Sequence, residues 1–349
     1  MNVKCGIIGL PNVGKSTIFN ILTKSKVSSL NFPFCTISPN IGFAQVYDNR
    51  LIKLKDIVCP NKLISTVVKI VDIAGLVKGA SKGEGLGNKF LSQIREVDAL
   101  IHVVRVFQDD NIIHVENFID PIRDINIINT ELIFSDIEQC EKSILMIKKY
   151  KNLNKNEFIR EKNLLKRCLS HLNKFYLLRT LKLSVKERFI INKFKFLTFK
   201  PTIFLININK NKNNNIFLDK VQKFLNKDLN NVICPDDIES SNYKDFKNYS
   251  KLNEIVNTIY KILNLETFFT VGKKEVRAWS FIKNSKIIEV AKIIHSDFSK
   301  GFIRAKVIKY IDFIRYKSEK DVKKKGKLRL EGKKYIVQDG DIIHFLFNI

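Results

Sequence analysis

The sequence lacks a long apolar run. No uninterrupted apolar stretch approaches the roughly 20 residues that span a bilayer, which excludes an ordinary membrane-spanning helix. The first residues, MNVKCGIIG, lead directly into an expected strand and do not have the pattern of a cleavable signal. We therefore expect a soluble, cytoplasmic protein that does not bind membranes.

The sequence is also poor in clustered cysteine and histidine. It has six cysteines and five histidines, and no CxxC pair. The cysteines are scattered at Cys5, Cys35, Cys59, Cys140, Cys168 and Cys234. This spacing argues against both a disulfide framework and a zinc site, and it is typical of thiols in a reducing cytosol.

Acidic residues are scarce relative to basic ones. The 35 Asp and Glu residues stand against 61 Lys and Arg residues, which gives a formal net charge of +26 and a pI near 9.7. Such an excess favours contact with polyanions, and RNA is the natural candidate. The alternative is that AT-biased coding enriched Lys and Asn without selection for binding. With 45% hydrophobic and 28% charged residues, the 349-residue chain can form two or three folded domains.

Strand-like and helix-like segments alternate in one part of the chain. Short apolar runs rich in β-branched residues predict buried strands of a mainly parallel sheet at 3–8, 67–71, 99–106 and 202–206. Helix-length segments at 16–24 and 88–97 alternate with them, as in an α/β domain. Such sheets bind nucleotides at the carboxyl ends of their strands.

A helical insertion and a C-terminal unit complete the expected organisation. Helical spacing from near Ile128 to Tyr150 and again over 157–181 predicts an antiparallel hairpin, with His171 at its packing edge or surface. After about Leu263 an autonomous small α+β domain is expected. Its expected elements are strands at 276–282, 302–308 and 342–347, a helix over 286–295, and a turn at 339–341 between two strands.

The strongest motif is GLPNVGKS at residues 9–16, which fits G-x-x-x-x-G-K-[ST] between an expected strand and an expected helix. Its glycines let backbone N–H groups point at phosphate oxygens, and Lys15 supplies a charge to the β and γ phosphates. The Ser16 hydroxyl is the expected Mg²⁺ ligand. The predicted nucleotide contacts in this motif are Asn12, Val13, Gly14, Lys15, Ser16 and Thr17.

A second motif, Asp72-Ile73-Ala74-Gly75, follows the strand predicted at 67–71. Asp72 is expected in the Mg²⁺ shell, and the Gly75 N–H is placed to contact the γ-phosphate. The glycine-rich continuation to residue 88 suits a loop that is ordered when nucleotide binds, although an idle surface loop is the alternative. In the intervening loop, Thr36 offers one hydroxyl to the metal.

The sequence gives weaker signals for the residues that select the base and for the group that positions the attacking water. Guanine-specific relatives of this fold carry N-K-x-D after the strand predicted at 202–206, whereas this chain has Asn207-Ile208-Asn209-Lys210 and no carboxylate, so strict GTP selectivity is not expected. The shifted register 209–212 also ends in Lys. Leu76 stands where many GTPases place a water-orienting Gln. His114 can position water, yet both His114 and His102 are equally compatible with a packing role.

The signature blocks resemble the YchF family of Obg-related ATPases over nearly the whole chain. The similar segments are 9–17, 31–42, 72–88, 102–115, 274–279, 295–305 and 335–348. The resemblance implies an Obg-type P-loop G domain formed by 1–127 and 200–263. It further implies a helical coiled-coil arm over 128–199 and a β-grasp-like TGS domain over 264–349.

The resemblance also implies an activity. This activity is Mg²⁺-dependent hydrolysis of ATP in preference to GTP, with His114 as the catalytic residue. The implied metal ligands are Ser16 and Thr36, and the implied adenine contacts are at Asn207 and Ile208. The implied partners are the large ribosomal subunit, the whole ribosome and ribosomal RNA. Two departures from the family pattern, Lys210 and Pro235, predict a loosened preference for adenine.

The resulting expectation is a slow, monomeric ATPase that changes conformation with nucleotide state. Two alternatives stay open at this point. One is an Obg-type GTPase, and the other is an RNA-binding or ribosome-binding module in which the nucleotide is only a structural ligand.

Overall fold

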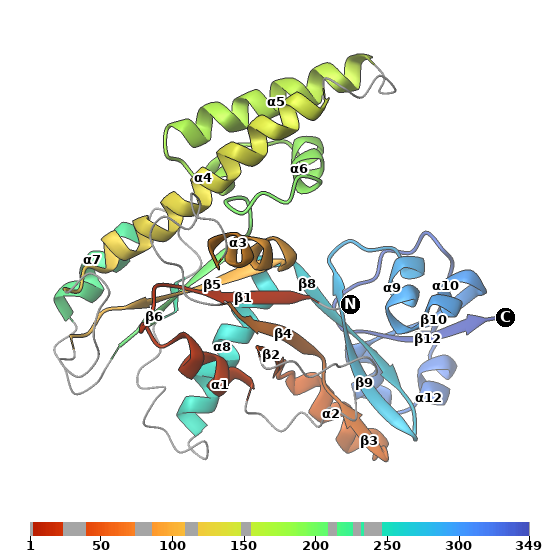
Figure 1. The fold of residues 1–349 in the computed structure, drawn as a ribbon. Coiled ribbons are helices and arrows are strands. Elements are labelled where there is room, and N and C mark those ends of the chain that lie inside the picture. Colours follow the sequence, from red (N-terminus) through yellow and green to blue (C-terminus); the bar gives the residue numbers. More distant parts are fainter. Residues whose placement is uncertain are drawn as a thin grey trace.

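The computed structural model describes residues 3–23, 40–73, 86–108, 118–147, 155–208, 215–225, 232–233 and 246–348. These residues build two six-stranded sheets and a helical arm (Figure 1). The strand order is β2-β4-β1-β5-β6-β7 in the first sheet and β11-β10-β12-β8-β9-β3 in the second. Among the described residues, no helix is both long enough and apolar enough to cross a membrane.

The first sheet is mainly parallel, as predicted. Its parallel strands are β1 (Lys4–Ile8), β4 (Val67–Asp72), β5 (Ala99–Arg105), β6 (Thr202–Asn207) and β7 (Val232–Ile233). Every residue of β5 and β6 is buried, which explains why both strands are continuous apolar runs in the sequence. The edge strand β2 (Ile41–Gln45), which was not predicted, runs antiparallel to β4.

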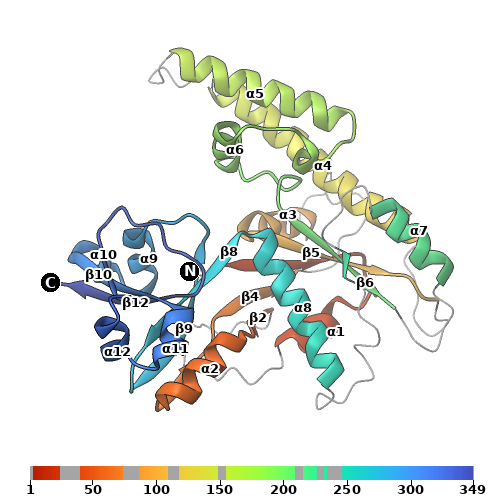
Figure 2. The same cartoon turned by 180° about the vertical axis from the view of Figure 1, so that it is seen from behind.

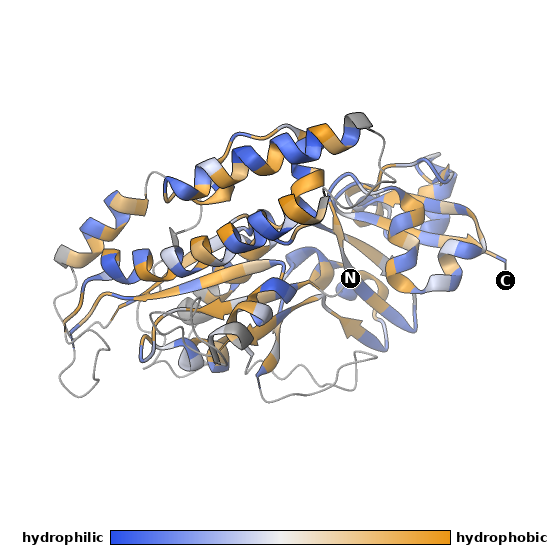
Figure 3. Cartoon of the chain, turned by 45° about the horizontal axis from the view of Figure 1, so that its top comes forward, coloured by the Kyte–Doolittle hydropathy of each residue, from blue (hydrophilic) through white to orange (hydrophobic). Residues whose placement is uncertain are grey.

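Helices cover both faces of the first sheet. In Figures 1 and 2, α3 (Leu86–Glu96) lies on one face, and α1 (Lys15–Thr23) and α8 (Phe246–Ile262) lie on the other. Hydropathy colouring shows apolar residues along the strands and mixed hydrophobic and hydrophilic residues along the helices (Figure 3). The hydrophobic core between these layers fixes the carboxyl ends of the strands, where the predicted site lies.

The helical arm consists of α4 (Pro121–Ile147) and α5 (Lys155–Asn173), followed by a 3-10 turn (Leu178–Thr180) and α6 (Val185–Asn192). Buried residues of α4, α5 and α6 share one core. The helix α7 (Asn215–Leu225) packs near the base of α4.

Two predicted ends of the arm helices were wrong. The helix predicted from 128 begins at Pro121, because the Asp120 carboxylate caps the N–H groups of Ile122 and Arg123, both at 3.1 Å. The helix predicted to reach 181 ends at Asn173. Two residues later, Phe175 adopts a left-handed φ of 61°, which does not continue the helix. His171 lies at the hairpin edge, as predicted, with its Nε2 at 3.0 Å from Thr180 Oγ1.

The second sheet contains the three strands predicted near the C-terminus and three that were not predicted, two of them C-terminal. Its C-terminal strands are β8 (Leu265–Val271), β9 (Glu275–Ile282), β10 (Phe302–Lys309), β11 (Arg329–Glu331) and β12 (Asp341–Phe347). Its helices are α9 (Ile287–Ile294), α10 (Ser296–Lys300), α11 (Tyr310–Tyr316) and α12 (Glu319–Lys324). The strand expected just before the 339–341 turn was wrong, since Ile336 forms only an isolated bridge with Lys286.

The sheet of the C-terminal unit extends beyond residues 264–349, which was not predicted. The strand β3 (Lys62–Ile64) pairs in parallel with β9 and forms an edge of the second sheet. The preceding helix α2 (Asn49–Val58) buries Leu51 and Leu54 in the same core as Phe269. The second sheet therefore includes a segment from the N-terminal third of the chain.

Candidate functional site

The loop between β1 and α1 is shaped by two glycines. Gly9 and Gly14 have φ values of +153° and +94°, which side-chain-bearing residues rarely adopt. A Cβ on Gly9 would lie 2.7 Å from the Val103 carbonyl oxygen, and one on Gly14 would lie 2.4 Å from Asn207 Nδ2. Asn12 has φ 61°, a left-handed conformation that Asn tolerates better than most residues. The backbone of this loop therefore requires these residue types.

Lys15 begins α1 and is folded over the loop. Its Nζ donates a hydrogen bond to the Leu10 carbonyl oxygen at 2.7 Å, and the residue is only 8% exposed. Burial lowers the pKa of Lys15 from its ordinary value, while the nearby Asp72 charge acts to raise it. The ammonium group and the free N–H groups of the helix start are thus at the same place, which is the arrangement that binds phosphate.

A hydroxyl and a carboxylate face each other across two elements. Ser16 Oγ on α1 donates a hydrogen bond to Asp72 Oδ2 at 3.0 Å, at the carboxyl end of β4. The described residues contain no group of three or more His, Cys, Asp or Glu that could hold a metal ion alone. Mg²⁺ beside a nucleotide does not require such a group, because phosphate oxygens and water complete its shell. Ser16 and Asp72 therefore fit the predicted Mg²⁺.

Asn207 connects the end of β6 with the phosphate loop. Its Nδ2 donates to the Val13 carbonyl oxygen at 3.0 Å, and the residue is buried. The contact predicted between Asn207 and the base stays a prediction, and the bond to Val13 was not predicted. No local pattern could reveal it, since the two residues are 194 positions apart. Ile208 follows directly and is half-buried.

His102 is a packing residue. It is 2% exposed within β5, and its ring lies against Phe204 of β6 with centroids 5.3 Å apart. Burial lowers the pKa of His102 to about 3, and the charges of Arg179 and Lys15 add to that effect. The ring is therefore neutral near pH 7 and does not shuttle protons there.

Three predicted site residues lie outside the described residues. They are Thr36, Gly75 and His114. Lys210 and Pro235, the departures from the family pattern, also lie outside them. The predicted roles of all five residues stay predictions.

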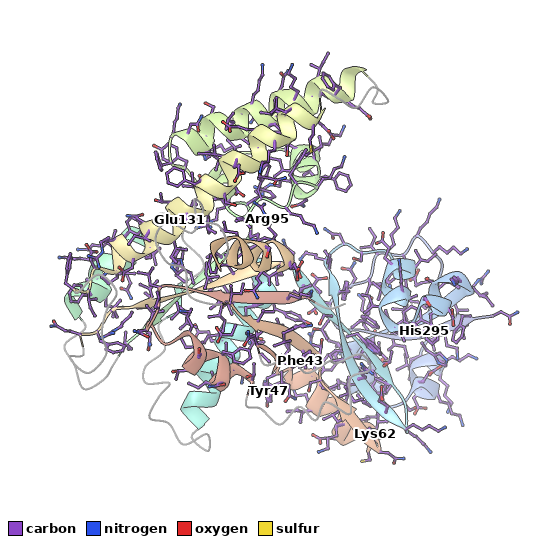
Figure 4. The ribbon with its side chains drawn as sticks, viewed as in Figure 1. Phe43, Tyr47, Lys62, Arg95, Glu131 and His295 are labelled. Carbon is purple, nitrogen blue, oxygen red and sulfur yellow. The ribbon has the colours of Figure 1, made fainter. Side chains whose placement is uncertain are left out.

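A buried junction joins the helical arm to the segment before β6 and was not predicted. Asp136 of α4 is fully buried and accepts hydrogen bonds from Leu197 N at 2.9 Å, Thr198 N at 2.7 Å and Thr198 Oγ1 at 2.7 Å. Arg95 of α3 lies 4.0 Å away and bonds Ser135 at 2.9 Å. Figure 4 shows Arg95 where α3 meets the arm. Because β6 starts at Thr202, this junction holds in place the segment that leads into the strand carrying Asn207.

The strand, glycine loop and helix, with Lys15 and Ser16 facing Asp72 on a neighbouring parallel strand, define a P-loop nucleoside triphosphatase. The family described as "50S ribosome-binding GTPase" matches residues 4–174. The YchF-GTPase C-terminal family, described as "Protein of unknown function (DUF933)", matches residues 265–348.

Relatives match the chain over its whole length. The "Ribosome-binding ATPase YchF" of Buchnera aphidicola subsp. Acyrthosiphon pisum (strain APS) is 53% identical over 363 aligned positions and covers 100% of both chains. The protein of the same name from Escherichia coli O157:H7 is 46% identical, with the same coverage. The "Structure of the Schizosaccharomyces pombe YchF GTPase" has a TM-score of 0.85 and 35% identity, covering 99% of this chain and 98% of that one. The chain therefore belongs to the YchF family.

The family resemblance and the fold class predicted from the sequence are thus confirmed. The C-terminal match is to a YchF C-terminal family, so the finer assignment of 264–349 as a TGS domain stays a prediction.

Proposed function

We propose that this chain is a Mg²⁺-dependent ATPase that binds ribosomes and changes conformation with the state of its nucleotide. The observation that carries the proposal is the meeting of Lys15, Ser16 and Asp72 at the carboxyl ends of β1 and β4. Curated relatives that match over their whole length are named ribosome-binding ATPases, which supports both halves of the proposal.

Backbone and side-chain groups of the loop both contribute to phosphate binding. Backbone N–H groups from Asn12 to Thr17 hold the phosphates, and the Lys15 ammonium leaves the Leu10 carbonyl to neutralise charge on the β and γ phosphates. Ser16 and Asp72, joined by Thr36, would hold Mg²⁺, which when bound neutralises charge on the same oxygens. Gly75 would donate its N–H to the γ-phosphate and so report whether that phosphate is present.

His114 is proposed to orient the attacking water. A neutral imidazole can accept a proton from water in this position, and Leu76 cannot. The burial and low pKa of His102 leave His114 as the better candidate of the two histidines that the sequence offered.

ATP is proposed as the preferred nucleotide, with the base held near Asn207 and Ile208. Asn207 Nδ2 already bonds Val13, and residues 207–212 contain no carboxylate at the position that would accept the guanine N1–H. The relative from S. pombe is titled a GTPase, so an Obg-type GTPase is the alternative. Competitive titration of ATP against GTP decides between them. A Kd for GTP well below that for ATP would overturn the assignment.

The enzymatic part is tested by single-turnover hydrolysis of radiolabelled ATP with purified chain. We expect Mg²⁺-dependent release of phosphate that is stimulated by ribosomes. Tight ATP binding without phosphate release would instead support a binding module in which nucleotide is a structural ligand. Co-sedimentation with 70S ribosomes and with isolated subunits tests the second half of the proposal.

The organisation of the protein follows the same proposal. Residues 1–127 and 200–263 would act as the G domain, 128–199 as the helical arm and 264–349 as the C-terminal, TGS-like domain. We propose a monomer in the cytoplasm that contacts the large subunit, the whole ribosome and ribosomal RNA, with the charge of +26 assisting association.

A further inference from the structure

The helix α6 is firmly held on the arm by one of its faces. Ser184 Oγ accepts from the Glu187 N–H at 3.3 Å, and the Glu187 carboxylate accepts from the Ser184 N–H at 2.8 Å, which forms a capping box. Glu187 also pairs with Arg167 of α5, and Ile191 is fully buried in the arm core. The face that carries Glu187 and Ile191 is therefore turned toward the arm.

The opposite face of α6 is apolar and exposed. Val185 is 86% exposed and Phe189 is 71% exposed, and they lie one helical turn apart. Asn192 lies on the same side, next to them in the helical projection, and is also exposed. An isolated exposed apolar residue needs no explanation. Here, however, a large aromatic ring is held outward on a helix that is already fixed by its cap and its core contact.

Cations frame this outward face. Helical spacing places Lys186 and Lys193 on one side of Phe189 and Arg188 on the other, and all three are exposed. Lys193 Nζ lies 5.9 Å from the Phe189 ring centroid and forms an exposed ion pair with Glu161 Oε1 of α5 at 3.3 Å, so Lys186 and Arg188 are the main candidates for contacting phosphate. Between residues 171 and 195 the only acidic residue is Glu187, which faces Arg167. The basic residues of that segment are Lys174, Arg179, Lys182, Lys186, Arg188, Lys193 and Lys195.

This combination of groups matches the chemistry of single-stranded RNA. Lysine and arginine contact phosphates, and an exposed aromatic ring stacks on an unpaired base. In duplex RNA the bases are stacked on each other and their faces are not accessible to a side chain. An acidic peptide could satisfy the cations, but it would need an aromatic side chain at the right position to stack on Phe189, whereas every unpaired base offers a flat face.

We infer that the outward face of α6, formed by Val185, Lys186, Arg188, Phe189 and Lys193, contacts an unpaired segment of RNA. The inference rests on the proposed function, because the ribosome is the partner that presents such RNA. It adds the location of the contact and the kind of RNA structure that is recognised.

The test uses the full chain, a fluorescent uridine dodecamer and an RNA duplex of the same length. Phe189→Ala should weaken binding of the dodecamer roughly fivefold to 150-fold, as expected for loss of one stacked base. Phe189→Trp should retain that binding, and neither change should alter duplex binding. The double variant Lys186→Ala/Arg188→Ala should lower the slope of log affinity against log salt by roughly 1.4.

Matched controls separate this surface from general charge. Phe175→Ala removes another aromatic of the arm that is 59% exposed, and Lys320→Ala/Lys325→Ala removes the same charge from the C-terminal region. If these controls weaken dodecamer binding as much as the α6 variants do, the inference is overturned. It is also overturned if Phe189→Ala weakens ribosome co-sedimentation but not dodecamer binding, since the partner is then a ribosomal protein.

The inference and the proposed function can fail separately. If the unaltered chain does not sediment with ribosomes, ribosome binding is refuted, and the dodecamer series still decides the role of α6. If the chain sediments with ribosomes and every α6 variant binds both dodecamer and ribosomes normally, only the α6 surface is refuted.

Discussion

Asp136→Ala should destabilise the junction between the helical arm and the first sheet. The substitution removes the acceptor of three buried donors, the N–H groups of Leu197 and Thr198 and the Thr198 hydroxyl. A buried donor left without a partner costs about 1–3 kcal/mol. Because the three losses share one site and are not fully additive, we expect a total of about 3–5 kcal/mol, which is toward the lower end of the sum for three independent donors. That loss is a large part of the roughly 5–15 kcal/mol that stabilises a typical domain.

Hydrogen exchange is the appropriate assay, since a chain with several cores need not unfold in one step. The free energy of local opening should fall at Leu197 and Thr198 and along β6 as far as Asn207, whose side chain holds the phosphate loop. ATP affinity should fall with it. Arg95, which is about a quarter exposed on its side chain, can be hydrated and should add little to the loss.

Glu138→Ala is the matched control on the same helix. Its side chain is 61% exposed and pairs only with the exposed Lys142 among the contacts of α4 described here. Such a surface pair contributes about 0–1 kcal/mol, so exchange along β6 should not change. Equal exchange rates in the Asp136→Ala and Glu138→Ala proteins would refute the reasoning.

Four further predictions follow from the site and its surroundings. His102 stays neutral when folded, with a pKa of about 3, so the free energy of unfolding should fall by up to about 1.4 kcal/mol per pH unit as the pH drops from 6.5 toward 3; acid unfolding of His102→Gln should lack this component. Lys15→Ala should lower ATP affinity roughly tenfold to 150-fold by calorimetry, through loss of a charged hydrogen bond, and unchanged affinity would contradict its placement. His114→Ala should spare ATP binding and remove most turnover, and normal turnover would exclude the histidine from the mechanism. Arg50→Ala breaks the ion pair to Asp339 at 2.6 Å and should speed exchange in the 338–341 turn, whereas an unaltered turn would show that the pair contributes nothing.

The central strands and the phosphate loop could be predicted because their signals are local. A strand buried on both faces, such as β5, must be continuously apolar, and a loop that wraps phosphate must have glycine where φ is positive. Helix ends were less predictable. The Asp120 cap and the left-handed Phe175 depend on single side chains and dihedral angles that the hydrophobic period does not report.

Contacts between distant segments could not be predicted in this way. The link between Asn207 and Val13 and the junction at Asp136 join segments that are far apart in sequence. The residues that make these contacts, Asn207 and Asp136, are of types that are also common in exposed loops and helices. Only the fold distinguishes these residues from their exposed counterparts.

The attachment of β3 to the second sheet matters most for the site. Thr66 Oγ1 lies 2.5 Å from Ser280 Oγ on β9, and Ser280 also bonds the Tyr260 hydroxyl of α8. The strand β4 begins at the next residue, Val67, and ends at Asp72, which faces Ser16. The strand β4 therefore connects the contact between Thr66 and the second sheet with Asp72, the proposed metal ligand. The second sheet helps to hold the Asp72 carboxylate in place, and a chain cut at residue 263 would lose that support as well as its C-terminal domain.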